Sequence, residues 1–172
     1  NTIHGQKCVI RILNPESFKI GMQNLGISES EQQMIEGFTK FENGMVLICG
    51  PTGSGKTTTL YTMLERENTI DKNIITIENP VEYNIFGINQ IQINEKIGLR
   101  FDNTLKFVLR QDPSVIMVGE IRDLETAKLA IRASITGHKV YSTIHTDDCY
   151  QSIIRLMDMG IEDYMIRASL KV

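Results

Sequence analysis

Residues 50–59 of the chain read GPTGSGKTTT and match the pattern GxxxxGK[ST] in full. An apolar run comes directly before this stretch and a segment of helical character follows it, which is the context that gives the pattern meaning. The glycines allow backbone N–H groups to turn inward around phosphate oxygens, and the start of a helix favours the same anion. The stretch therefore predicts a phosphate-binding loop. We expect these residues to hold a nucleotide: Gly50, Pro51, Thr52, Gly53, Ser54, Gly55, Lys56, Thr57 and Thr58.

The loop belongs to a regular alternation of short apolar runs and helix-length segments. The runs are too short for buried helices but have the right length for buried strands. Strands are expected at residues 45–49, 74–77, 115–118 and 140–144, and helices at 57–66, 101–111 and 124–135. Repetition of strand, helix and strand implies parallel pairing. The pattern therefore predicts an α/β fold, a mostly parallel sheet with helices on both faces.

The remaining segments give weaker signals. Helices are expected at residues 28–40, where a serine can cap the first turn, and at 148–157 and 162–170. Residues 88–93 alternate in polarity and predict a half-exposed strand. Residues 8–13 predict another strand, whose purpose is obscure without preceding sequence. Because the chain starts at Asn1 and has no terminating signal, we interpret it as part of a longer protein.

Polar groups follow each of the four apolar runs. These are the glycine loop, then Glu78, then Glu120, and then His145. In open parallel sheets, ligands bind outside the carboxyl ends of the strands. We therefore expect these groups to meet at one edge of the sheet, beside the nucleotide.

The acids and the histidine at these positions are candidate catalytic residues. Glu120 follows a buried strand, so it can hold the Mg²⁺ shell together with the Thr57 hydroxyl, or orient and deprotonate the attacking water. The alternative to a catalytic role is that the Glu120 carboxylate only forms an ion pair with Arg122 at the strand end. Glu78 and Glu82 flank Asn79 and could act on water or metal, or could form a solvated turn. His145 could contact a γ-phosphate, although a strand-end histidine is often structural.

Arginines are candidates for stabilising negative charge in the transition state. Arg100, Arg110 and Arg122 could act in their own subunit or reach a neighbour. Each could equally be a solvated helix or turn residue, and the sequence does not choose among them.

Composition limits the classes of protein that remain. The 172 residues carry 18 Lys+Arg and 21 Asp+Glu, a formal charge of −3, which disfavours a nucleic-acid translocase. No apolar run reaches the 18 or so residues that a membrane span needs. The three cysteines show no CxxC spacing, so a reducing compartment fits best. We interpret Cys49 as a small apolar strand end.

Four segments resemble the secretion ATPase superfamily, in particular the assembly ATPases of type II secretion, type IV pili and competence pili. They read GPTGSGKTTTLY (50–61), TIENPVEY (76–83), LRQDPSVIMVGEIRD (109–123) and TGHKVYSTIHTDD (136–148). Together they span nearly the whole chain after Gly44, in family order and spacing. The opening TIHGQKCVIRIL (2–13) looks like the linker-side end of the domain that precedes the motor in such proteins.

The resemblance implies a RecA-like motor domain at residues 28–172, truncated at its C-terminus, with residues 1–27 ending a preceding domain and its linker. It implies a cytoplasmic homo-hexamer, peripheral to the inner membrane, that binds a platform protein. ATP hydrolysis with Mg²⁺ would drive pilin or pseudopilin assembly, and no nucleic acid is expected. By the family pattern Glu120 is the catalytic carboxylate, Glu78 and Glu82 form the acidic box, and His145 is the His-box residue.

One position departs from the family pattern. The acidic box usually reads Glu-Asp-Pro, whereas the middle residue here is Asn79. An amide keeps the shape of the aspartate side chain but loses its charge. We therefore expect Glu78, Glu82 and Glu120, rather than Asn79, to act as base or metal ligand. The substitution also leaves open a nucleotide-binding module with little hydrolysis. A retraction motor of the same superfamily is a further alternative.

Overall fold

The computed structural model describes residues 3–10 and 21–172. Its centre is a five-stranded sheet in which every pair of neighbours is parallel, in the order β1-β5-β4-β2-β3. The strands are β1 (Gly44–Cys49), β2 (Ile74–Glu78), β3 (Asn89–Gln92), β4 (Val115–Val118) and β5 (Lys139–Ile144). The predicted α/β class is therefore confirmed, with a RecA-like core.

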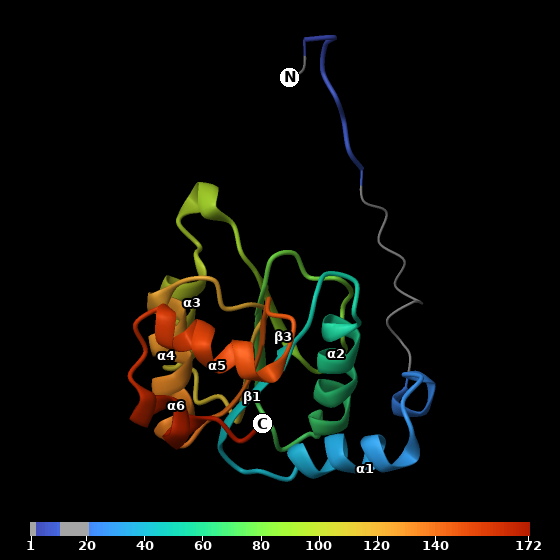
Figure 1. Cartoon of the computed structure of the whole chain (residues 1–172), viewed down its shortest axis with the longest axis vertical. Coiled ribbons are helices and arrows are strands. Elements are labelled where there is room, and N and C mark those ends of the chain that lie inside the picture. The colour runs from blue at the N-terminus through green and yellow to red at the C-terminus, as the bar shows by residue number, and fades with distance from the viewer. Residues whose placement is uncertain (1–2, 11–20) are drawn as a thin grey trace.

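Helices cover both faces of the sheet (Figure 1). On one face, α2 (Lys56–Glu67) packs against β1, β4 and β5, and α1 (Glu29–Phe38) adds Ile35 and Phe38 at the margin. On the other face lie α3 (Phe101–Val108), α4 (Leu124–Ile135), α5 (Cys149–Asp158) and α6 (Asp163–Ser169). Residues 3–10 and 21–172 also contain two short 3₁₀ turns, Met22–Asn24 and Glu95–Ile97.

The burial of the strands explains their sequence. Strands β2, β4 and β5 are buried along their whole length, because helices cover them on both sides. Strand β3 lies at the sheet edge and is half-exposed, as predicted: Asn89 and Gln92 are exposed, and Gln90 and Ile91 are half-buried. The other edge is extended by the last residues of the chain, where Lys171 donates to the Met45 carbonyl and Leu47 donates to that of Val172.

Most predicted elements are confirmed, with ends that differ by at most three residues. The Ser28 side chain caps α1 in a capping box with Glu31, so the predicted start of this helix is correct. The strand predicted at residues 8–13 is wrong for residues 8–10, which have no strand pairing. Residues 11–13 lie outside the described residues. The domain boundary after residue 27 stays a prediction.

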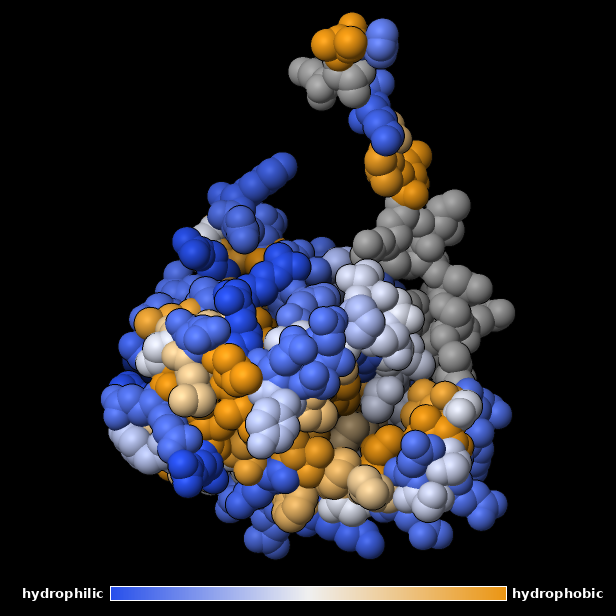
Figure 2. All heavy atoms as spheres, in the orientation of Figure 1, coloured by the Kyte–Doolittle hydropathy of each residue, from blue (hydrophilic) through white to orange (hydrophobic). Residues whose placement is uncertain are grey.

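An apolar surface covers part of the molecule over α5 and α6 (Figure 2). Helix α5 buries only Ser152 and Leu156. Its other large apolar side chains, with one from α6, are exposed: Tyr150, Ile153, Ile154, Met157 and Tyr164.

Among residues 3–10 and 21–172, no helix is both long and apolar enough to cross a membrane.

Candidate nucleotide site

The glycine loop joins β1 to α2 and is shaped around the Lys56 side chain. The Lys56 ammonium donates hydrogen bonds to the carbonyls of Gly50, over 2.7 Å, and Pro51, over 2.8 Å. Gly50 has φ +144°, and a Cβ there would lie 2.7 Å from the Ser54 hydroxyl. Only glycine fits both restrictions. The loop thus encloses a positive charge at the N-terminus of α2, where a phosphate oxygen can replace the carbonyls as its partner.

The sheet register brings three of the predicted groups to one edge. Cys49 pairs with Ile144, so Gly50 and His145 leave neighbouring strands side by side. Strand β5 also pairs with β4, and the Thr143 hydroxyl donates to the Gly119 carbonyl over 2.6 Å, one residue before Glu120. His145 therefore follows the strand that lies between the phosphate loop and Glu120.

Glu120 lies in a small charged cluster. Its carboxylate is 2.6 Å from Arg122 Nε and 3.6 Å from His145 Nε2. The Glu120 side chain is only 11% exposed, while those of Arg122 and His145 are 68% and 50% exposed. A shielded carboxylate beside a solvent-facing imidazole can hold a water molecule and accept its proton. The ion pair between Glu120 and Arg122, which the sequence allowed as the alternative to a catalytic role, is therefore present as well.

Glu78 lies in a different environment from Glu120. It is 3% exposed and accepts hydrogen bonds from the hydroxyls of Tyr61 and Thr76 and, over 3.2 Å, from the amide of Gln90. Burial raises the pKa of its carboxyl, although the three donors act in the opposite direction. The geometry makes Glu78 an anchor between β2, β3 and α2.

The rest of the acidic box is attached to the same anchor. The Glu82 backbone N–H donates to the Tyr61 hydroxyl over 3.2 Å, and the Glu82 side chain is half-buried. The Asn79–Pro80 peptide bond is cis, and both residues are exposed. The structure therefore joins the box to α2, the helix that begins at Lys56. The catalytic roles predicted for Glu78 and Glu82 stay predictions.

The arginines are distributed over both edges of the sheet. Arg122 lies at the site through Glu120, whereas Arg110 is exposed beyond the C-terminus of α3. The segment after Arg110 is held at the amino end of β2, where Asn73 donates to the Gln111 carbonyl. This is the edge opposite the phosphate loop. The structure does not bring Arg110 to the nucleotide site of its own chain. Arg100 precedes α3 and lies 3.8 Å from Asp102.

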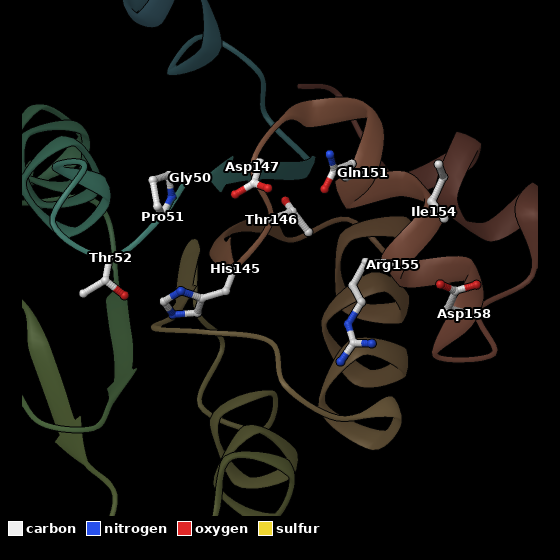
Figure 3. A pocket seen from close by; sticks show the side chains of 10 residues that line it. All are labelled: Gly50, Pro51, Thr52, His145, Thr146, Asp147, Gln151, Ile154, Arg155 and Asp158. Carbon is white, nitrogen blue, oxygen red and sulfur yellow. The ribbon is translucent and has the colours of Figure 1, made fainter.

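A cavity of about 560 Å³ adjoins the phosphate loop (Figure 3). The first loop residues form one wall, and the segment from β5 into α5 forms the other. Figure 3 shows the His145 ring between Thr52 of the loop and Arg155 of α5. The full lining is Gly50, Pro51, Thr52, His145, Thr146, Asp147, Gln151, Ile154, Arg155 and Asp158.

Sequence reasoning missed several contributors to this region. Tyr61 and Gln90 carried no signal, because their hydrogen bonds to Glu78 span 17 and 12 residues. Arg155 reads as an ordinary helix arginine, and only the fold places it at the cavity. Asp148 could be recognised from the sequence, because aspartate is a preferred residue at the N-cap of a helix. In the structure it caps α5 by accepting a hydrogen bond from the Gln151 N–H, three positions later.

The donors at the site suit a small, hard cation held together with phosphate. The Thr57 hydroxyl lies in the first turn of α2, and the Glu120 carboxylate faces the same edge of the sheet. Hydroxyl and carboxylate oxygens are ligands that Mg²⁺ accepts, usually with phosphate and water oxygens. Within the described residues, no group of three or more His, Cys, Asp and Glu could hold a metal ion by itself. The predicted pair Thr57 and Glu120 therefore fits Mg²⁺ that arrives with a nucleotide.

A parallel α/β sheet with this loop at its carboxyl edge defines a P-loop nucleotide-binding protein. A family model described as "Type II/IV secretion system protein" matches residues 1–172, and the chain belongs to that family. The resemblance to the secretion ATPase superfamily is thereby confirmed.

Curated relatives agree with the family. The chain is 49% identical over 169 residues to the type II secretion system protein E of Xanthomonas campestris, covering 98% of this chain and 30% of that protein. It is 45% identical over 167 residues to the type II secretion system ATPase E of Vibrio cholerae, covering 97% of this chain and 33% of that protein. The chain thus spans about a third of the length of these relatives.

Solved structures give the same fold. The pilus retraction motor PilT with bound ADP matches with a TM-score of 0.75 and 37% identity, over 86% of this chain and 43% of that chain. The ATPase DotB of Legionella pneumophila matches with a TM-score of 0.70 and 29% identity, over 86% of this chain and 41% of that chain. This chain therefore shares its core with the pilus retraction motor PilT and the ATPase DotB.

Proposed function

We propose that the protein containing this chain hydrolyses ATP with Mg²⁺ and couples hydrolysis to type II protein secretion or pilus assembly. The observation that carries the proposal is the meeting of the phosphate loop, His145 and the Glu120 carboxylate at one sheet edge. An ATPase needs a phosphate cradle and a group that activates water, and these residues supply both. The names of two relatives, type II secretion system protein E and type II secretion system ATPase E, support the same activity.

Each residue then has a defined task. Lys56 exchanges its loop carbonyls for the outer phosphate oxygens and neutralises their charge. Bound Mg²⁺ would be held by Thr57 and Glu120 and would neutralise further phosphate charge. Glu120 orients the attacking water and accepts its proton, and His145 donates a hydrogen bond toward the terminal phosphate. Glu78 acts through Tyr61, which fixes α2 and thereby the end of the loop.

We infer that the working unit is a homo-hexamer at the cytoplasmic face of the inner membrane, in contact with a platform protein and indirectly with pilins or pseudopilins. The exposed apolar surface over α5 and α6 supports assembly with further protein surface. Arg110, which faces away from its own site, is available to a neighbouring subunit. The acidic charge of the chain supports action without nucleic acid.

The test uses the full-length protein. Replacing Lys56 with Ala removes the cation of the loop, so nucleotide binding and turnover should both be lost. Glu120→Gln keeps the shape but removes the base, so binding should remain while turnover falls by about 100-fold or more. Lys40→Ala is the matched control, because Lys40 is exposed and lies outside the site. Unchanged phosphate release in Lys56→Ala would refute the proposal.

The similarity to PilT favours a second candidate, a pilus retraction motor. The site chemistry is the same in both, so cellular readouts must separate them. Deleting the gene of an assembly or secretion ATPase removes pili or secreted substrate, whereas deleting that of a retraction motor leaves pili that accumulate. A full-length protein that binds ATP but releases no phosphate would instead support a nucleotide-binding module, in line with Asn79.

A further inference from the structure

Two thiols meet directly behind the phosphate loop. The sulfur atoms of Cys49 and Cys149 lie 3.6 Å apart, although the residues are 100 positions apart in sequence. Cys49 is half-buried at the end of β1, and Cys149 is exposed as the first residue of α5. The fold thus pairs two cysteines that sequence spacing does not connect.

This pair bridges the two walls of the cavity beside the loop. Cys49 is bonded to Gly50, whose carbonyl accepts a hydrogen bond from Lys56. Cys149 opens the helix that brings Gln151 and Arg155 to the opposite wall. A covalent bond between the thiols would therefore restrain the loop against α5.

We propose that Cys49 and Cys149 are a reversible oxidation site whose disulfide restrains the phosphate loop. A peroxide is the oxidant. The exposed Cys149 thiol is first oxidised to a sulfenic acid, and the peroxide is reduced with release of one water. The Cys49 sulfur then attacks the sulfenic sulfur, the disulfide forms, and the second water leaves. Two molecules of a small thiol restore both cysteines and become one small disulfide.

The geometry sets what the bond does and how readily it forms. A disulfide requires about 2.05 Å between sulfurs, so the two walls must approach by part of the difference from 3.6 Å. The hydrogen bond with Cys49 raises the pKa of the Cys149 thiol, so oxidation needs excess peroxide at neutral pH. A displacement of about 1 Å at a reacting site can cost up to ~100-fold in rate, and we expect turnover to fall on the order of tenfold.

The effect on turnover rests on the proposed function, but formation of the bond does not. The full-length protein is treated with hydrogen peroxide, its remaining thiols are blocked, and it is digested with trypsin without reduction. Mass spectrometry should detect peptide 41–56 joined to peptide 140–155, and dithiothreitol should separate them. ATP turnover of the same samples is measured before and after oxidation and after reduction.

Three variants give matched comparisons. Cys8→Ser leaves the pair intact, so it should keep the linked peptides and the reversible loss of turnover. Cys49→Ser and Cys149→Ser should lose both. Failure to find the linked peptides in the oxidised wild type would overturn the proposal, as would a linked protein with full turnover. If the reduced wild type has no turnover but the linked peptides form, the proposed function fails while the oxidation site stands.

Discussion

The Lys139 ammonium donates a hydrogen bond to the Glu67 carboxylate over 2.6 Å, and both side chains are at most 5% exposed. Glu67 is the last residue of α2 and Lys139 the first of β5, so this ion pair lies at the edge of the sheet opposite the phosphate loop. The Tyr141 hydroxyl donates to the same carboxylate oxygen over 2.7 Å, and Lys72 pairs with the other oxygen. The helix that begins at Lys56 is thus fixed to the sheet at its far end.

Replacing Glu67 with Gln should destabilise the fold. Breaking a buried ion pair leaves an uncompensated charge, here the Lys139 ammonium, and typically costs about 3–5 kcal/mol. Lys72→Ala is the control, because Lys72 is partly exposed and its pair should contribute no more than about 1 kcal/mol. Urea unfolding measures both free energies. Equal, small losses in the two variants would show that the buried pair contributes little.

The stability contributed by Glu67 should depend on pH. Burial raises the pKa of its carboxyl, but Lys139, Lys72 and Tyr141 more than offset this effect, and the net pKa is lowered. A carboxyl with a lowered pKa in the folded protein contributes stability above its unfolded pKa, near 4.5. That contribution is lost as pH falls through the folded value. The difference in free energy of unfolding between wild type and Glu67→Gln should therefore be constant at neutral pH and shrink in acid.

The sequence predicted the local elements and the edge where the site lies, but not the contacts between distant elements. Apolar runs define strands because burial of each run is a local property. The insertion of β5 between β1 and β4 depends on pairing across the whole chain, so the place of His145 beside Glu120 could not be predicted. Glu78 and Glu120 both follow apolar runs. Only the fold shows that Tyr61 and Gln90 engage Glu78, whereas Arg122 and His145 face Glu120.

Gly50→Ala should weaken nucleotide binding more than it weakens the fold. Its positive φ disfavours alanine, and the new Cβ would contact the Ser54 hydroxyl, so the loop must shift away from the geometry that receives phosphate. Gly37→Ala is the matched control. Gly37 lies in helix α1 with open space around a Cβ, and alanine there should stabilise by about 0.5–1 kcal/mol. Titration with a fluorescent ATP analogue compares the two, and wild-type affinity in Gly50→Ala would contradict the model of the loop.

The pair of Glu120 and Arg122 allows the two roles of Arg122 to be separated. If Arg122 positions the Glu120 carboxylate through their 2.6 Å contact, Arg122→Ala should lower turnover by about tenfold in the wild type and have no further effect in Glu120→Gln. Arg122→Lys keeps a cation near the carboxylate and should recover part of the activity. If Arg122 instead stabilises transition-state charge directly, the two losses should multiply. Because 68% of the Arg122 side chain is exposed, a third result is informative: unchanged turnover in Arg122→Ala would reduce the contact to a surface ion pair.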